Sequence, residues 1–234
     1  MKTFIHDTLT SSQTTARQHL KTESCPFVVF AHTQTSGYGK YGRVWQAFKG
    51  NFTVTYALNL SIEHYDFGKL PMLICIKLCK LLSTLTHSEN IFTIKWPNDI
   101  LLNKKKFCGI LIEKIDNKFL IGIGMNLRLS PEEHSTPYPT TNVLHETGVL
   151  IEPETILAEM SAYFENFEAI LTECDAAQVR QTYMALLEGK GQNIKVVTRK
   201  ETIFGVLQDI NHDGALILNV DGATQLIYAA DIFI

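Results

Sequence analysis

The sequence lacks an excess of basic residues, a paired-cysteine motif and a long apolar run. Its 21 lysines and arginines are balanced by 24 aspartates and glutamates, for a formal net charge of −3. That balance argues against a nucleic-acid partner, because binding to duplexes depends on neutralising phosphates with basic side chains. The five cysteines include no Cys-x-x-Cys pair and no zinc-ligand spacing. We therefore assign no metal-binding residues and expect reduced thiols in a cytoplasmic protein.

Targeting and membrane segments are also missing from the sequence. Residues 1–10 carry no apolar stretch of the kind found in signal peptides. The most apolar segment, residues 70–85, is interrupted by Lys77 and Lys80, which argues against a membrane span. The P-loop, Gly-x-Ser-x-Gly and His-Glu-x-x-His motifs are absent, and no nucleophile–base pair stands out. We therefore expect catalysis by positioning and charge stabilisation rather than through a covalent enzyme intermediate.

What the chain does contain is enough apolar residues for a sizeable core. Hydrophobic residues make up 45% of its 234 positions, and their periodicity predicts a mixed α+β domain over residues 1–188. Short alternating strands then predict a small antiparallel barrel or sandwich over residues 189–234. The expected helices cover residues 14–20, 66–86, 153–171 and 175–188, and residues 130–141 are expected to form a loop. The expected strands cover residues 27–32, 51–60, 92–96, 100–102, 106–114, 119–127, 193–198, 202–210, 215–219 and 224–228.

Two of the expected strands have one face of unusually small side chains. Over residues 51–60, Thr55 belongs to a face of small polar residues that lies opposite a face of large apolar ones. Over residues 119–127, Gly122, Gly124 and Asn126 share one face. A strand with such a bare face allows close approach of another backbone or of a ligand.

A glycine-rich loop follows the first of the expected strands. Residues 36–45, SGYGKYGRVW, combine three glycines with Lys40, Arg43 and Trp45. Glycines allow main-chain amides to turn towards an anion, and the two basic side chains add the charge that a phosphate or carboxylate requires. Trp45 could shield such a pocket or stack on a base. The alternative is a flexible hairpin that is basic by chance, because short glycine-rich patterns are common.

Residues 95–113, KWPNDILLNKKKFCGILIE, place polar groups at the ends of apolar strands. Pro97 fixes the backbone before Asn98 and Asp99. These two side chains could bind a hydroxyl group or a hydrated divalent cation. Alternatively, they form a turn that satisfies its own backbone groups.

The three lysines of this segment have different expected environments. Lys106 begins the strand that continues through the following glycine, so its position is fixed by secondary structure. A lysine held in this way beside an anionic ligand can stabilise negative charge in a transition state. Lys104 and Lys105 are expected to be solvated turn residues.

These motifs, in this order, resemble those of the biotin–protein ligases, and the resemblance covers most of the chain. Its most specific part is Lys-Trp-Pro-Asn-Asp followed by Lys-x-x-Gly-Ile-Leu, which matches residues 95–111. The family's Gly/Arg-rich loop resembles residues 37–45, and its Gly-x-Gly-x-Asn strand resembles residues 122–126. The resemblance implies the biotin/lipoate ligase fold, a class II synthetase-like mixed β-sheet flanked by helices, with a small C-terminal SH3-like β-barrel.

The resemblance also implies an ATP-dependent reaction in two steps. Biotin and ATP, the latter with Mg2+, give biotinyl-5′-AMP and pyrophosphate; the biotinyl group then passes to a lysine of a biotin carrier protein domain. The implied catalytic residues are Lys106, Arg43 and Lys40. The implied biotin-binding residues are Ser11, Ser12, Gln13, Gln34, Tyr38, Gly39, Lys40, Thr55, Lys106 and Gly109. The implied ATP-binding residues are Gly37, Arg43, Trp45, Asn98, Asp99, Lys106 and Asn126.

The chain departs from the family pattern at two places. Tyr38 and Lys40 stand where the family loop has arginines. Because lysine cannot bind an anion in bidentate fashion, we expect looser retention of the adenylate. Gln13, in Ser11-Ser12-Gln13, stands where relatives have the asparagine of Ser-Thr-Asn. The sequence starts almost directly at the catalytic domain, so we expect a short form without a DNA-binding domain and without a repressor role.

Two other functions remain open from the sequence. A lipoate–protein ligase shares the fold and the adenylation chemistry, although its Arg-Arg-x-Ser-Gly-Gly-Gly loop is absent here. A non-catalytic biotin- or nucleotide-binding protein would not need Lys106 or Arg43, and both are present. The sequence is compatible with a monomer or a homodimer, and it does not identify the acceptor protein.

Overall fold

The computed structural model describes residues 1–61, 67–132 and 135–234. The chain divides into two units: Met1–Ser61 with Lys105–Thr172, and Ile62–Lys104 with Glu173–Ile234. Among the residues that the sequence places in the site, Asn98 and Asp99 belong to the second unit and all the others to the first. The first unit therefore carries most of the candidate site.

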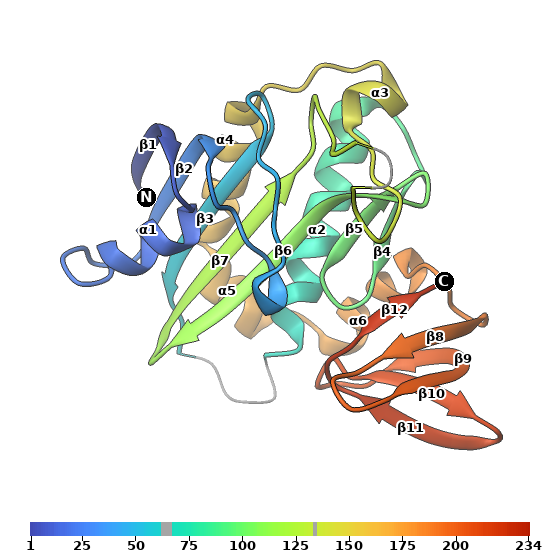
Figure 1. Ribbon diagram of the computed structural model, residues 1–234. Helices are drawn as coiled ribbons and strands as arrows, with labels where there is room; N and C mark the ends of the chain where they lie inside the picture. The colour runs from blue at the N-terminus through green and yellow to red at the C-terminus, as the bar shows by residue number, and fades with distance from the viewer. Residues whose placement is uncertain (62–66, 133–134) are drawn as a thin grey trace. The chain divides into compact units, whose positions relative to one another are not determined.

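A mixed β-sheet forms the centre of the first unit. Its strands are β1 (Lys2–Leu9), β2 (Phe27–Gln34), β3 (Phe52–Asn59), β7 (Lys118–Met125) and β6 (Lys105–Ile115), in this spatial order (Figure 1). β1 runs parallel to β2, and the other neighbouring pairs are antiparallel. β1 was not predicted, because its side chains are mostly exposed and polar and show no apolar alternation. The mixed sheet predicted from the resemblance is confirmed.

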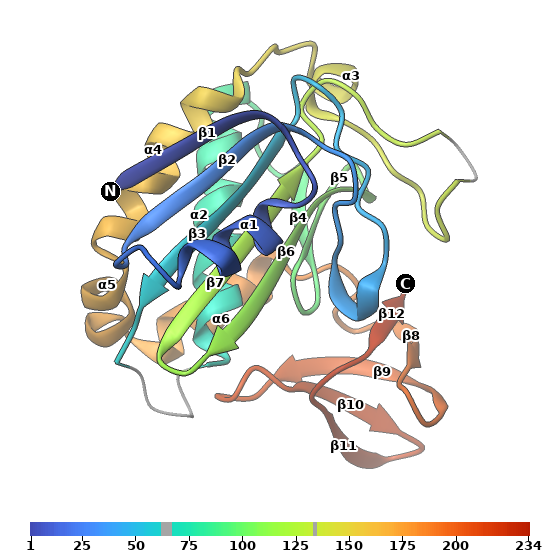
Figure 2. The same ribbon diagram turned by 60° about the vertical axis from the view of Figure 1, so that its left-hand side comes forward.

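Helices cover both faces of this sheet (Figure 2). On one face, α1 (Ser12–His19) packs against β2, β3 and β7 through an apolar cluster that consists of Ala16, Phe27, Val29, Ala57 and Leu120. On the other face, α4 (Pro153–Glu165) contacts β3. The predicted helix 153–171 is instead two helices, because α4 ends at Glu165 and α5 (Phe167–Glu173) begins after Asn166. A short helix, α3 (Val143–Thr147), was not predicted.

The second unit combines helices with two sets of strands. β4 (Phe92–Lys95) pairs antiparallel with β5 (Asp99–Leu102). α2 (Lys69–Thr86) and α6 (Ala176–Leu186) pack against each other and against β4. The predicted start of α2 at residue 66 lies outside the described residues. No helix of the described ranges is long and apolar enough to cross a membrane.

The C-terminal strands form an antiparallel sheet with the order β11-β10-β9-β8-β12. The bounds are β8 (Asn193–Val197), β9 (Thr202–Ile210), β10 (Leu216–Val220), β11 (Ala223–Ile227) and β12 (Asp231–Phe233). The four predicted strands are confirmed within one or two residues at each end, and β12 was missed because of its short length. Closure of this sheet into an SH3-like barrel stays a prediction.

The cysteines allow a test of this packing. All five are free thiols; Cys75, Cys79 and Cys108 are buried, whereas Cys25 and Cys174 are partly exposed. Burial raises the pKa of the Cys79 thiol to about 12, and the thiolate is the reactive form. We expect Ellman's reagent at pH 8 to titrate no more than two thiols in the folded protein and all five after denaturation. Rapid reaction of a third thiol in the folded protein would contradict the packing of α2 and β6.

Candidate active site

Two glycines of β7 make room for side chains on one face of the sheet. Gly122 lies opposite Thr55 of β3, and a Cβ atom there would be 2.7 Å from Oε1 of Gln13. A Cβ atom on Gly124 would be 2.3 Å from Cε2 of Trp45. Both distances are too short for any real contact, so only glycine at these positions lets Gln13 and Trp45 lie on the strand. The predicted bare face of residues 119–127 is confirmed.

The start of α1 is the first part of the site. Ser11 caps the helix, since its Oγ accepts a hydrogen bond from the amide of Thr14 at 3.5 Å. The amide of Ser12 donates to Oε1 of Gln34 at 2.6 Å, and the Oγ of Ser12 lies 2.8 Å from Oγ1 of Thr55. Residues of α1, β2 and β3 thus converge, and five predicted biotin-binding side chains form one cluster, Ser11, Ser12, Gln13, Gln34 and Thr55.

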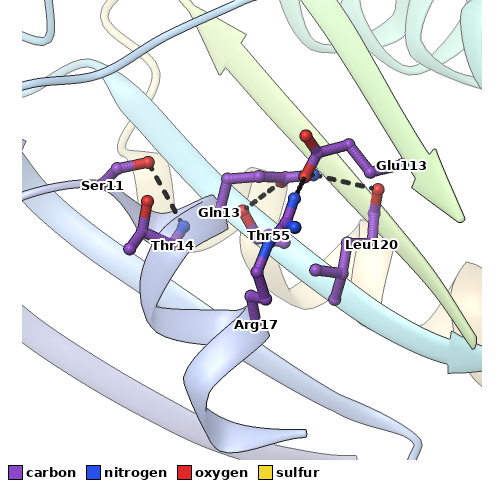
Figure 3. A network of polar contacts seen from close by, with 7 residues as sticks. All are labelled: Ser11, Gln13, Thr14, Arg17, Thr55, Glu113 and Leu120. Atoms are coloured by element: carbon purple, nitrogen blue, oxygen red, sulfur yellow. Dashed lines mark hydrogen bonds and ion pairs between the residues drawn. The ribbon is translucent and has the colours of Figure 1, made fainter. Parts of the chain in front are cut away.

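Gln13 connects this cluster to β6 (Figure 3). Its Nε2 donates to Oε2 of Glu113 at 2.9 Å and to the carbonyl of Leu120 at 3.2 Å. Its Oε1 accepts from Oγ1 of Thr55 at 3.0 Å. Glu113 also forms an ion pair with Arg17 at 2.8 Å, which raises the pKa of the Arg17 guanidinium through a hydrogen bond and charge attraction. Glu113 and Arg17 were missed from the sequence, because they lie 96 positions apart and no local pattern links them.

The glycine-rich loop closes on itself through main-chain hydrogen bonds. Trp45 donates to the carbonyl of Gly37 at 2.8 Å, and Gly39 donates to the carbonyl of Arg43 at 2.8 Å. The loop tip is a single turn, η1 (Lys40–Gly42), in which Tyr41 has a φ of 60°. Lys40 and Arg43 are both exposed. The loop thus has the form of a hairpin with basic side chains at its tip.

A cavity of about 350 Å³ lies between this loop and a wall formed by Pro131 and residues 135–140. Four of the predicted ATP-binding residues line it, Arg43, Trp45, Lys106 and Asn126. Tyr138 and its neighbours form much of the remaining wall. They were predicted only as a loop, since no periodicity or charge pattern marks residues 130–141. Lys40 and Gly109 are not among the residues that line the cavity. Gly109 lies on β6, where it pairs with Gly124 of β7.

Lys106 is held in place by its main chain. Its amide donates to the carbonyl of Pro139 at 2.9 Å, and its carbonyl accepts from the amide of Thr141 at 3.1 Å. Its Nζ lies 5.0 Å from the ring centroid of Tyr138 and 5.9 Å from that of Trp45. An ammonium group within about 6 Å of aromatic ring centroids is stabilised electrostatically. The expectation that secondary structure fixes Lys106 is confirmed.

The prediction that Lys105 is a solvated turn residue is wrong. Lys105 begins β6, and its Nζ pairs with Oε1 of Glu146 at 3.0 Å. The same carboxylate oxygen accepts from Oγ1 of Thr141 at 2.6 Å. These contacts of Glu146 stabilise the chain on both sides of Lys106, at Lys105 and at Thr141. Lys104 is the turn residue, with a φ of 64°.

Asn51 is a further residue that the sequence did not reveal. Its Oδ1 accepts from the amides of Leu127, Arg128 and Leu129 at 3.0–3.2 Å. Its Nδ2 lies 3.4 Å from Oδ1 of Asn126, whose own Nδ2 donates to the carbonyl of Thr141 at 3.2 Å. The Asn126 amide is therefore oriented from both ends within the cavity wall.

In the second unit, the segment around Asn98 and Asp99 is fixed by its own neighbours. Nε1 of Trp96 donates to the carbonyl of Gly214 at 2.9 Å, and the hydroxyl of Tyr183 donates to the carbonyl of Pro97 at 3.2 Å. Burial raises the pKa of Tyr183 well above its ordinary value, so this hydroxyl stays protonated and can donate. Asp99 begins β5 opposite Lys95. The place of Asn98 and Asp99 beside ATP stays a prediction.

Comparison with known proteins gives matches over nearly the whole chain. Residues 6–130 match the model of the "Biotin/lipoate A/B protein ligase family", and residues 190–234 match that of the "Biotin protein ligase C terminal domain". The chain is 30% identical over 213 residues to the biotin–[acetyl-CoA-carboxylase] ligase of Paracoccus denitrificans, covering 88% of this chain and 89% of that protein. It is 29% identical to the bifunctional ligase/repressor BirA of Bacillus subtilis, covering 97% of this chain and 72% of that protein.

The fold is similar to that of solved structures. The biotin protein ligase of Aquifex aeolicus in complex with biotin and ATP superposes with a TM-score of 0.83 at 20% identity. The superposition covers 99% of this chain and 97% of that one. The predicted α+β fold is thereby confirmed.

The contact between Gly124 and Trp45 can be tested directly. We expect Gly124→Ala to displace the indole ring and to lower the free energy of unfolding by about 1–3 kcal/mol, because overpacking has costs of this order. Thermal unfolding and tryptophan emission would measure the two effects. Gly39→Ala is the matched control, because its φ of −115° suits alanine and its Cβ atom would meet only the carbonyl of Arg43, at 3.9 Å. Equal stability of the two variants would contradict the close packing of Trp45 on β7.

Proposed function

Because this chain belongs to the biotin/lipoate A/B protein ligase family, we propose that it activates biotin with ATP and transfers it to a lysine of a carrier protein. The observation that carries this proposal is the placement of Lys106 in a cavity that is also lined by Arg43 and Trp45 of the glycine-rich loop. The match of residues 190–234 to a biotin protein ligase domain favours biotin over lipoate. We retain residues 1–188 as the catalytic part and residues 189–234 as a small C-terminal domain.

In the first step, a carboxylate oxygen of biotin attacks the α-phosphorus of ATP. A phosphorus–oxygen bond forms, the bond to the bridging oxygen of the β-phosphate breaks, and pyrophosphate leaves with the electron pair. Negative charge builds up on the α-phosphate oxygens during this step. An immobilised ammonium group stabilises that charge without having to reorganise, which is the role we assign to Lys106. Lys40 and Arg43, at the exposed tip of the loop, would add positive charge when the loop contacts the adenylate.

The cluster at the start of α1 suits the ureido ring of biotin. Ser12, Gln13 and Thr55 are buried and uncharged, and they carry hydroxyl and amide groups. A neutral ring with N–H donors and one carbonyl acceptor requires partners of this kind, since a buried polar group needs a hydrogen bond. Ser11 and Gln34 support the same cluster. In addition, Tyr38, Gly39 and Gly109 are assigned to the biotin side.

The cavity suits the nucleotide. Trp45 and Tyr138 supply aromatic surfaces for a base, and Lys106 supplies a cation for the phosphates. Asn126 offers an amide with a fixed orientation, and Gly37 shapes the loop. We also assign Asn98 and Asp99 to the binding of ATP. Mg2+ would enter with ATP. No group of three His, Cys, Asp or Glu side chains among the described residues is arranged to hold a metal, so phosphate and water oxygens would supply most of its ligands.

In the second step, a neutral lysine amine of the carrier attacks the carbonyl carbon of biotinyl-5′-AMP. An amide bond forms, AMP leaves with the electron pair of the broken carbon–oxygen bond, and the amine loses a proton. We assign the acceptor lysine to a biotin carrier protein domain. We place the reaction in the cytoplasm, where ATP is available; the five free thiols are in keeping with this assignment. A monomer or a homodimer would serve this reaction, and it requires no nucleic acid.

Exchange of pyrophosphate tests the substrate. We expect the purified chain to incorporate labelled pyrophosphate into ATP when biotin is present, because adenylate formation is reversible. Lipoate should not support the exchange. Exchange that depends on lipoate alone would reassign the protein to the lipoate ligases, and binding of biotin without exchange would indicate a non-catalytic protein.

Lys106→Ala tests the proposed charge stabilisation. We expect formation of biotinyl-5′-AMP in a single turnover to slow by about a hundredfold, because the variant removes a preorganised positive charge. Lys104→Ala is the matched control from the same run of lysines, since the Lys104 side chain is 79% exposed. If the two variants reacted at equal rates, Lys106 would have no part in the transition state.

A further inference from the structure

The residue at position 13 creates a contact that a shorter amide could not make. Glutamine stands here where the resembling family has asparagine, and its extra methylene group extends the amide across the sheet. The amide reaches Glu113 of β6 and the carbonyl of Leu120, which occupy paired positions on neighbouring strands. Gly122 leaves the space above β7 that the amide occupies. The side chain of Gln13 is only 3% exposed, so its polar groups depend on these partners.

We propose that Glu113 is a positioning residue that fixes the direction of the Gln13 amide in the biotin site, so that Oε1 of Gln13 faces the hydroxyl of Thr55. This inference rests on the proposed function. It concerns how the polar side chains that would surround the ureido ring are held: without the acceptor at Glu113, the Gln13 amide would lose its fixed direction and the Thr55 hydroxyl would lose its acceptor.

The first step concerns the orientation of the Gln13 amide. Nitrogen and oxygen of an amide are distinguished by their partners. A carboxylate and a main-chain carbonyl can only accept hydrogen bonds. Since Glu113 and Leu120 both face the same end of the amide, this end is the NH2 group, and both of its hydrogens are used (Figure 3). Oε1 must then point towards Thr55.

The second step carries this direction to Thr55. Oε1 of Gln13 can only accept, and the Thr55 hydroxyl, 3.0 Å away, donates to it. The same hydroxyl lies 2.8 Å from Oγ of Ser12 and is also placed to donate there. The Thr55 hydroxyl therefore links the fixed Gln13 amide to Ser12 at the start of α1.

Arg17 holds Glu113 in the required rotamer. Its Nη2 shares the carboxylate oxygen Oε2 with the Gln13 amide. The Arg17 side chain is 51% exposed, so the ion pair itself adds little stability. The ability of Glu113 to accept a hydrogen bond, more than its charge, is what the network requires. A neutral side chain with an acceptor oxygen at position 113 should therefore preserve much of the effect.

A series of variants at position 113 tests this requirement. We expect Glu113→Met to raise the KM for biotin by about tenfold, the effect of one lost buried hydrogen bond. The kcat and the KM for ATP should stay within about twofold, because the network does not touch the phosphates. Glu113→Gln keeps an acceptor oxygen and should lose affinity by no more than about threefold. Glu23→Met is the control, because it removes another carboxylate that pairs with a surface cation, Lys2, at 2.6 Å; it should leave biotin binding unchanged.

A double-mutant cycle tests the path through Gln13. Gln13→Leu should weaken biotin binding in calorimetry, and adding Glu113→Met should weaken it no further, because the path is already interrupted. Glu113→Leu, which also removes the acceptor oxygens, replaces Glu113→Met in the cycle if that variant fails to fold. Fully additive losses, or wild-type affinity in Glu113→Met or its replacement, would overturn the role of Glu113 while leaving the proposed function intact. If the wild-type chain itself did not bind biotin, both would fall.

Discussion

The absence of side chains on two residues of β7 is the constraint on which the rest of the site depends. Gly122 and Gly124 leave the strand surface bare, and Gln13 and Trp45 occupy the two spaces. These side chains come from different parts of the chain, one from the start of α1 and the other from the end of the glycine-rich loop. The sheet therefore fixes the separation between the proposed biotin end and the proposed nucleotide end. A methyl group at either position would disturb one end and leave the other in place.

The parts of the site that the sequence predicted are those with a local signature. The glycine spacing of β7 and the strand position of Lys106 each follow from neighbouring residues. The resemblance then placed Ser12, Gln34 and Thr55 together, and the structure brings them within hydrogen-bonding distance. β3 and β7 were predicted for the same reason, since large and small residues alternate along these two strands.

The parts that were missed depend on contacts between distant segments. Glu113 and Asn51 appear in the sequence as ordinary polar residues of a strand and a turn. Their importance arises because one faces Gln13, 100 positions away, and the other orients Asn126, 75 positions away. Tyr138 was missed for a similar reason, because its segment has no periodicity, and the neighbouring Pro139 and Thr141 form main-chain hydrogen bonds with Lys106, which is distant in the sequence. The edge strand β1 is too exposed to show an apolar pattern.

The proposed biotin end and the proposed nucleotide end of the site offer different interactions, hydrogen bonds at one and positive charge at the other. Each kind of interaction suits the ligand group assigned to that end. At the α1 end, buried neutral groups form a network of hydrogen bonds in which the direction of the Gln13 amide is fixed, and they add no charge. At the cavity end, a single ammonium group lies near two aromatic rings and attracts phosphate without distinguishing its oxygens. The order of these interactions matters, because a carboxylate can react with a phosphate only where the two ends meet. Lys106 is assigned to both ends, and its fixed main chain makes it the reference point for the reacting atoms.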